Sequence, residues 1–213
     1  EVGCVMRSIA DFCPRGAESG VGLALQDNQG RYLFFLAGKG LYCPPGQRFY
    51  AGIGGHREPG EDWLACAHRE ALEEVGTDIG VLSAPVTWYI PQAGAAQQVE
   101  LSDRPRPLAL YEMIHPPGTP RAGEVYRIVV YRARLCGLPE KLQEDEVLAI
   151  VALTREQVVR GLDRKPALAQ LLEEGARIVT SAEPLDRQIR LYPLGTARAL
   201  AHVLQQTPPA YTL

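Results

Sequence analysis

Glycine and proline occur so often in this chain that they leave little room for long secondary-structure elements. The 213 residues include 21 glycines and 17 prolines, spread along most of the sequence. Because proline removes a backbone donor and glycine favours turns, this spacing divides the chain into short segments. Short strands tolerate such division better than long helices do, so the sequence predicts a sheet-rich or mixed fold.

Most of the short segments have the composition of β-strands. Residues 21–26 and 31–37 are apolar runs joined by Asp-Asn-Gln-Gly, which predicts a β-hairpin. The long glycine-rich loop at 38–60 has room for one short strand, around 49–53. Four later segments are rich in the β-branched and aromatic residues that suit strands, at 81–90, 107–114, 125–135 and 146–153.

One strongly helical stretch stands in the first half of the chain, at residues 62–75. Asp62 is placed to cap its first N–H groups, and Gly76 is placed to end it. Three further helices are expected after the last strand, at 155–160, 166–174 and 196–205. The sequence contains no linker-like change in composition. We therefore expect a single domain over 1–213, with a core at about 18–175 and a C-terminal helical extension at 176–213.

The helix at 62–75 gathers three carboxylates on one side. At 100° per residue, Glu73 and Glu74 lie within about 60° of Glu70. Like charges at these spacings repel by about 0.2–0.5 kcal/mol per pair, so we expect an exposed acidic face that needs a cation against it. Mg²⁺ prefers hard oxygen ligands of this kind. The alternative interpretation is an ordinary solvated acidic face.

The residues around this helix resemble the signature of the Nudix hydrolases, the Nudix box G-x5-E-x7-R-E-U-x-E-E-x-G-U, where U is a bulky aliphatic residue. All of its fixed positions are filled, by Gly55, Glu61, Arg69, Glu70, Glu73, Glu74 and Gly76. Ala71 and Thr77 stand at the two U positions, a departure that affects local packing more than chemistry. The resemblance implies an α/β fold, an α/β/α sandwich with a mixed central β-sheet.

The resemblance also implies roles for the box carboxylates. Glu73 and Glu74 would be metal ligands, and Glu74 is also counted among the catalytic residues. Glu70 would either bind the metal or act catalytically by taking a proton from water. Glu61 would hold the metal through a water molecule or fix the loop before the helix.

The remaining box positions would support these carboxylates. Arg69, the third catalytic candidate, would orient the glutamates through charge-assisted hydrogen bonds. Gly55 and Gly76 would supply backbone geometry that a side chain obstructs.

An acidic run precedes the last predicted strand, at Glu144, Asp145 and Glu146. Some Nudix enzymes carry a further acidic residue at this place, which completes the metal site or serves as the general base. Glu144 and Glu146 are therefore candidates for a second-site base. The alternative is solvated loop charge.

Three residues are candidate substrate contacts. His56 and Arg57 lie inside the box loop, where a cationic or hydrogen-bonding side chain could contact phosphate. Pro91 stands 15 residues after Gly76, close to the position of a proline in Nudix enzymes that cleave ADP-ribose. Each of the three could also be an ordinary surface or packing residue.

Charge and cysteine content exclude several other classes of protein. The net charge of −3 argues against a protein that binds nucleic acid through a basic surface. The longest apolar runs, such as 147–153, are far shorter than the roughly 20 residues that span a bilayer, so no membrane association is expected. Five widely spaced cysteines with no C-x-x-C pair are typical of reduced thiols, which favours the cytoplasm.

The function predicted from these features is Mg²⁺-dependent hydrolysis, with Mn²⁺ as a substitute metal. The substrate would be a small nucleoside diphosphate linked to another moiety, such as an ADP-ribose-like compound or a nucleotide sugar. A homodimer is compatible with the sequence. The alternative is a non-catalytic Nudix-fold sensor of a nucleotide ligand, although the retention of all four box glutamates favours catalysis.

Overall fold

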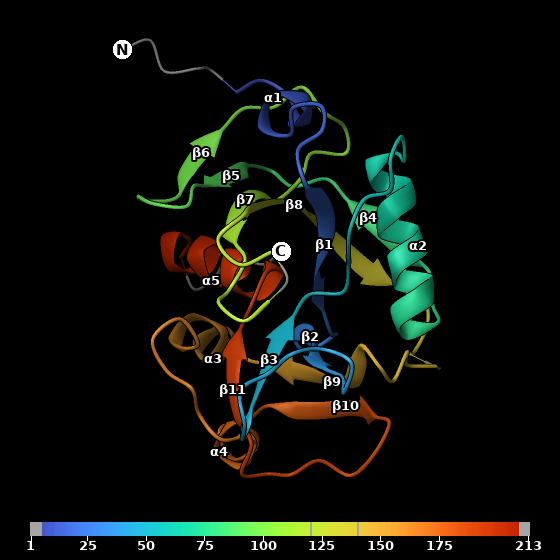
Figure 1. Ribbon diagram of the computed structural model, residues 1–213, viewed down its shortest axis with the longest axis vertical. Helices are drawn as coiled ribbons and strands as arrows, with labels where there is room; N and C mark the ends of the chain where they lie inside the picture. The colour runs from blue at the N-terminus through green and yellow to red at the C-terminus, as the bar shows by residue number, and fades with distance from the viewer. Residues whose placement is uncertain (1–5, 120, 140, 209–213) are drawn as a thin grey trace.

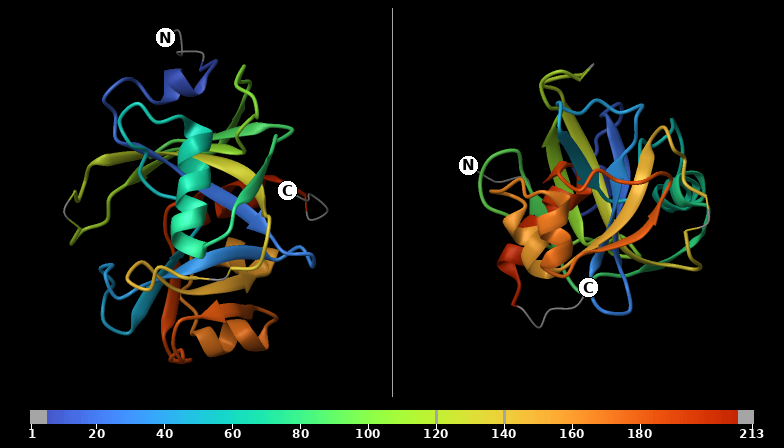
Figure 2. Two further views of the ribbon diagram at one scale, coloured as in Figure 1. Left: turned by 90° about the vertical axis from the view of Figure 1, so that its right-hand side faces the viewer. Right: turned by 90° about the horizontal axis from the view of Figure 1, so that it is seen from below.

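A mixed β-sheet runs through the molecule, with helices on both of its faces (Figure 1, Figure 2). The computed structural model describes residues 6–119, 121–139 and 141–208. The strands are β1 (Ser19–Gln26), β2 (Tyr32–Ala37), β3 (Gln47–Ala51), β4 (Ile79–Leu82), β5 (Thr87–Ile90), β6 (Gln97–Val99), β7 (Ala109–Ile114), β8 (Val125–Leu135), β9 (Val147–Leu153), β10 (Arg177–Ser181) and β11 (Arg190–Pro193). The helices are α1 (Ile9–Phe12), α2 (Trp63–Val75), α3 (Arg155–Arg160), α4 (Leu168–Glu173) and α5 (Thr196–Gln206).

The sheet has parallel and antiparallel neighbours. Its order is β10-β9-β2-β1-β8-β7-β5-β6, with β3 beside β2, β11 beside β3 and β4 beside β8. β1 and β2 form the predicted hairpin, in which Leu25 lies opposite Leu33. β1 also runs parallel to β8, from Ser19 opposite Arg127 to Leu25 opposite Ala133. The start of β1 therefore lies beside the first half of β8.

Two apolar clusters attach the helices to the two faces of the sheet. On one face, Ile128 and Val130 of β8 belong to a cluster with residues of α3, α4 and α5. On the other face, Val129 and Tyr131 belong to a cluster with residues of α1 and α2. Successive side chains of a strand point to opposite faces, so the central residues of β8 are buried on both sides. The predicted α/β/α sandwich with a mixed central sheet is confirmed.

The strand predicted over 81–90 is wrong as a single element. The segment forms two strands, β4, which pairs with β8, and β5, which pairs with β7 and β6. Pro85 lies between them and has no N–H to donate to a sheet ladder. The chain consequently leaves one part of the sheet and joins another.

The segment after residue 175 is more than a helical extension. It contributes β10 beside β9 and β11 beside β3 before α5 begins. Neither strand was predicted from the sequence, because β10 is short and mostly exposed and β11 is short and ends in proline. Leu191 of β11 and Leu200 of α5 are buried in the same cluster as the sheet. We therefore propose that the core at 18–175 and the extension form one domain.

Two observations concern the environment of the protein. Within the described ranges, no helix combines the length and apolar content that crossing a bilayer requires. Cys13, Cys43, Cys66 and Cys136 are free thiols, and Cys4 lies outside the described residues.

Candidate active site

Helix α2 carries most of the predicted site, and its two ends form as the sequence predicts. The Asp62 carboxylate accepts hydrogen bonds from the backbone N–H groups of Leu64 and Ala65, at 2.9 and 3.3 Å. Gly76 ends the helix in the left-handed region, with φ of 67°, and its N–H donates to the carbonyl of Leu72. This cap requires the positive φ that glycine adopts most readily.

The three carboxylates of α2 do not share an exposed face, which corrects the expectation from the helical wheel. Glu73 is exposed, whereas Glu70 and Glu74 are only 9% and 3% exposed. The wheel treats the helix in isolation, but the loop at Gly54 and Gly55 covers this side of α2. Ala71, the departure at the first U position, is fully buried in the core cluster on the α2 face of the sheet.

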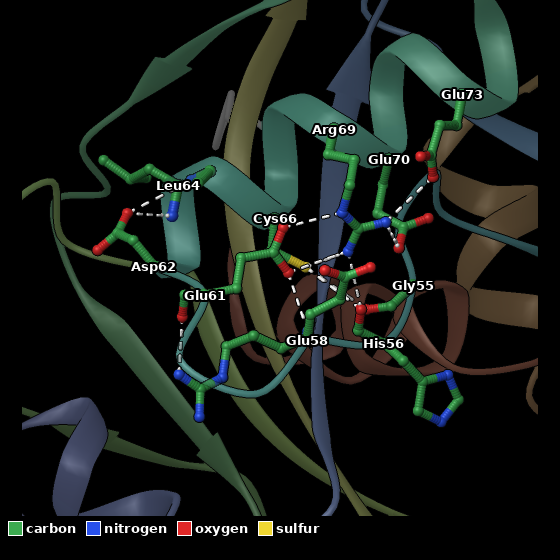
Figure 3. A network of polar contacts seen from close by, with 12 residues as sticks. Gly55, His56, Glu58, Glu61, Asp62, Leu64, Cys66, Arg69, Glu70 and Glu73 are labelled. Atoms are coloured by element: carbon green, nitrogen blue, oxygen red, sulfur yellow. Dashed lines mark hydrogen bonds and ion pairs between the residues drawn. The ribbon is translucent and has the colours of Figure 1, made fainter.

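Arg69 connects three box carboxylates (Figure 3). Its Nε and Nη2 donate to the two oxygens of Glu61, at 2.8 and 3.0 Å. Its Nη1 donates to Glu70 at 2.7 Å and to Glu73 at 3.0 Å. Nη2 also donates to the carbonyl of His56 at 3.0 Å. One guanidinium thus ties the helix to the box loop and reduces the repulsion between the carboxylates.

The box carboxylates differ in their preference for the ionised form. Hydrogen bonds from Arg69 lower the pKa of Glu61 to about 2. Desolvation raises the pKa of Glu70, and it raises the pKa of Glu74 more strongly, to well above its usual range. Glu61 is therefore a stable anion that anchors Arg69, whereas ionised Glu70 and Glu74 need a nearby positive charge.

The loop before α2 approaches these buried carboxylates through its backbone. The N–H of Gly54 donates to Glu74 Oε2 at 2.9 Å. A Cβ atom at Gly55 would lie 2.5 Å from both carboxylate oxygens of Glu70. The glycine at this box position is needed because Glu70 occupies the space that any side chain would take.

We predict that Gly55→Ala lowers kcat by about 10- to 100-fold because the added methyl group displaces the Glu70 carboxylate. Gly80→Ala is the matched control, since a Cβ at Gly80 in β4 meets no atom within 4 Å. Steady-state kinetics on both variants tests this. Equal activity in the two would contradict the proposed contact between Gly55 and Glu70.

The acidic loop at 144–146 reaches the site through Glu146. The backbone N–H groups of Gly38 and Gly40 donate to the carbonyls of Glu146 and Asp145, at 2.7 and 2.8 Å, and hold the loop in place. The negative charge of Glu146 contributes to the raised pKa of both Glu70 and Glu74. Of the two candidate second-site bases, Glu146 is therefore the one that is among the main electrostatic influences on Glu70 and Glu74.

The three candidate substrate contacts lie in different surroundings. The imidazole of His56 points away from Arg69, as Figure 3 shows. Arg57 stacks over the ring of Trp63 at 4.3 Å, and its Nη1 donates to the carbonyl of Glu61 at 2.9 Å, so part of its guanidinium supports the start of α2. Pro91 lies in the connection between β5 and β6, and no hydrogen bond or ion pair among the described residues joins it to the box. A substrate contact by any of the three stays a prediction.

The donor atoms are suited to a hard divalent cation. Glu70 Oε2 and Glu74 Oε1 have no hydrogen-bond partner among the described residues, and both carboxylates have raised pKa values. However, no three His, Cys, Asp or Glu side chains in the described part of the chain already form a cation-binding group. Arg69 binds Glu70 and Glu73 in their present positions. Their carboxylate oxygens are of the type that binds Mg²⁺. Glu73 would have to leave Arg69 in order to bind the metal.

One cluster beside the box was missed by the sequence analysis. Glu18, just before β1, lies 2.8 Å from His56 and 2.8 Å from Arg121, and His115 lies 3.2 Å from the same carboxylate. These residues come from three distant segments of the chain. No local spacing connects them, so only the fold reveals the cluster.

A comparison with protein families assigns the chain. The family model described as "NUDIX domain" matches residues 17–174. The chain belongs to the Nudix family. With its complete box, this Nudix protein is an enzyme of the pyrophosphohydrolase class.

Several solved Nudix structures are similar to this one. A NUDIX hydrolase from Nitrosomonas europaea is 16% identical, with 74% of this chain and 87% of that chain covered and a TM-score of 0.47. A MutT NUDIX hydrolase from Burkholderia pseudomallei is 20% identical, with 67% of this chain and 86% of that chain covered and a TM-score of 0.42. A NUDIX-family hydrolase from Clostridium perfringens is 13% identical, with 75% of this chain and 93% of that chain covered and a TM-score of 0.44. A comparison with curated proteins finds no match.

Proposed function

We propose that this Nudix protein is a Mg²⁺-dependent hydrolase that cleaves the pyrophosphate bond of a nucleoside diphosphate linked to another moiety. The observation that carries this proposal is the pair of buried carboxylates Glu70 and Glu74, each with one oxygen that has no hydrogen-bond partner among the described residues. Burial favours the neutral form of both groups, so a divalent cation would be the natural partner of their ionised form. Mn²⁺, which also binds oxygen ligands, is expected to substitute for Mg²⁺.

In this proposal, Glu73 and Glu74 hold the metal, Glu70 acts as the general base, and Glu61 acts through Arg69. A bound Mg²⁺ would neutralise phosphate charge and make a nearby water more acidic. Glu70 Oε2, which has no hydrogen-bond partner among the described residues, is placed to accept a proton from that water. Arg69 keeps Glu70 oriented through Nη1, while its bidentate contact with Glu61 fixes the guanidinium.

The substrate is proposed to be an ADP-ribose-like compound or a nucleotide sugar. The support is the position of Pro91 relative to the box, which resembles Nudix enzymes that cleave ADP-ribose. We further propose that the protein acts in a reducing compartment such as the cytoplasm, because its described cysteines are free thiols. A homodimer is compatible with this proposal.

We predict that a panel of nucleoside diphosphate derivatives will include a substrate whose hydrolysis requires Mg²⁺ and stops in EDTA. When the reaction is run in H₂¹⁸O, mass spectrometry should find the label on a phosphate product, because water attacks phosphorus. Label found only on a non-phosphate fragment would contradict this mechanism. Tight binding of a nucleotide without turnover of any panel member would instead support the non-catalytic sensor.

A further inference from the structure

Glu18, His56, His115 and Arg121 form a polar cluster beside the box loop, here called the Glu18 cluster. Glu18 Oε1 lies 2.8 Å from His56 Nε2, 2.8 Å from Arg121 Nη1 and 3.2 Å from His115 Nε2. Burial raises the pKa of Glu18, but hydrogen bonds from His56 and Arg121 outweigh it and leave that pKa below its usual value. Glu18 is therefore an anion shared by several donors.

A buried tyrosine fixes the two imidazoles of the cluster. The ring of Tyr126 stacks with His56 at 4.6 Å and with His115 at 5.5 Å between centroids, with interplanar angles of 26° and 27°. Tyr126 belongs to β8 and is buried in the core of the sheet. The positions of both imidazoles are thus determined by the central sheet rather than by a free loop.

The Glu18 cluster adjoins the buried carboxylates of the active site. His56 follows Gly55 directly, and Gly55 is in contact with the carboxylate of Glu70. A Cβ atom at Gly20 would lie 1.9 Å from the Tyr126 hydroxyl and 2.1 Å from the Gly55 carbonyl oxygen, so strand and loop meet at this point. The carbonyl of His56 also accepts the hydrogen bond from Arg69. The Glu18 cluster therefore lies next to the place where a substrate would be held at Glu70.

The exposed members of the cluster have unused donors. The side chain of Glu18 is 12% exposed, whereas those of His56 and Arg121 are 63% and 53% exposed. A guanidinium has five N–H donors, and a single carboxylate cannot satisfy Arg121 and two imidazoles fully. The remaining donors suit an anion that arrives from solvent.

We propose that Arg121 and His56 form a phosphate subsite of the enzyme. It binds the phosphate of the diphosphate bridge that does not lie against Glu70 and Glu74, and Glu18 and His115 hold the subsite in position. This proposal rests on the proposed function, since it assumes a diphosphate substrate. It adds Glu18, His115 and Arg121, which lie outside the Nudix box, to the residues that select the substrate.

The test compares two ligands that differ by one phosphonate group. The ligands are AMP and α,β-methylene-ADP, in which a CH₂ group replaces the bridging oxygen so that the bridge is not hydrolysed. Each is titrated into the full-length protein with Mg²⁺ by isothermal titration calorimetry. We expect the wild-type protein to prefer α,β-methylene-ADP. Arg121→Gln should reduce this preference by about 10-fold or more because a charge-assisted hydrogen bond is lost. Arg121→Lys should restore part of it, since it keeps the charge but not the planar fork.

Arg187→Gln is the matched control, because Arg187 is exposed and its side chain forms no hydrogen bond or ion pair within the described part of the chain. It should leave the preference unchanged. A purely structural role of Arg121 would weaken both ligands equally and would overturn the proposal, as would a wild-type protein that does not prefer the diphosphate. The measurement needs no turnover, so absent hydrolysis in the substrate panel would count against the proposed function alone.

Discussion

Glu74→Gln is expected to remove most of the catalytic activity and yet to stabilise the metal-free protein. Glu74 is 3% exposed, and desolvation raises its pKa well above the usual range. Glutamine has the same shape and its amide oxygen can accept the Gly54 N–H, but it has no charge for burial to penalise. Loss of this charge from the proposed metal site should lower kcat by at least about 10²-fold.

The gain in stability should depend on pH in a definite direction. In the unfolded chain Glu74 loses its proton around its ordinary pKa of 4.5, whereas in the folded protein it keeps the proton to higher pH. As pH rises above 4.5, the unfolded state is therefore favoured progressively until the folded-state pKa is passed. Glutamine does not titrate. The Tm advantage of Glu74→Gln over the wild type should grow as pH rises through this window.

Thermal melts in EDTA at several pH values and kcat at saturating Mg²⁺ test this prediction. Glu173→Gln, at the exposed end of α4, is the control for removing one negative charge. Glu73→Gln should lower kcat by at least about 10²-fold as well, but without the stability gain, because Glu73 is exposed and pairs with Arg69 at 3.0 Å. Near-normal turnover of both Glu73→Gln and Glu74→Gln would contradict the proposed metal site.

The part of the site that could be predicted from sequence is the part that depends on local geometry. The cap at Asp62, the end at Gly76 and the positions of Glu70, Glu73 and Glu74 along one helix follow from helical periodicity and nearby residues. The Nudix box adds Gly55 and Glu61 at fixed offsets. The contact between Gly55 and Glu70 explains in physical terms why that offset matters.

Features that depend on long-range packing could not be predicted. A helical wheel cannot show that Glu70 and Glu74 are buried, because the sheet and the Gly54–Gly55 loop bury them. The Glu18 cluster combines residues from distant parts of the chain, since Glu18 and His115 alone are 97 positions apart. β10 and β11 have weak local signals and exist because they pair with β9 and β3. In each case, a tertiary contact determines the outcome.

The second large effect on kcat is expected when the general base is removed. Glu70→Gln is expected to lower kcat by about 10²- to 10⁴-fold and to flatten the acidic limb of the pH–rate profile. Glu70 lies under Gly55, Arg69 holds one of its oxygens at 2.7 Å, and burial raises its pKa above the usual value, which increases its basicity. Because Glu70 acts as the base in this interpretation, Mg²⁺ affinity should fall less than in Glu74→Gln.

Glu146 is the alternative candidate for the general base. Its variant therefore tests the assignment of Glu70 to that role. It is exposed, and its charge acts on both Glu70 and Glu74, so it lies within electrostatic reach of the site. Kinetics across pH and Mg²⁺ titrations of Glu70→Gln, Glu146→Gln and the control Glu144→Gln separate the two roles. If Glu70→Gln loses Mg²⁺ affinity as severely as Glu74→Gln, Glu70 is a ligand. Glu146→Gln should then flatten the acidic limb instead, because the loop at Gly38 and Gly40 holds Glu146 beside the carboxylates that bind the metal.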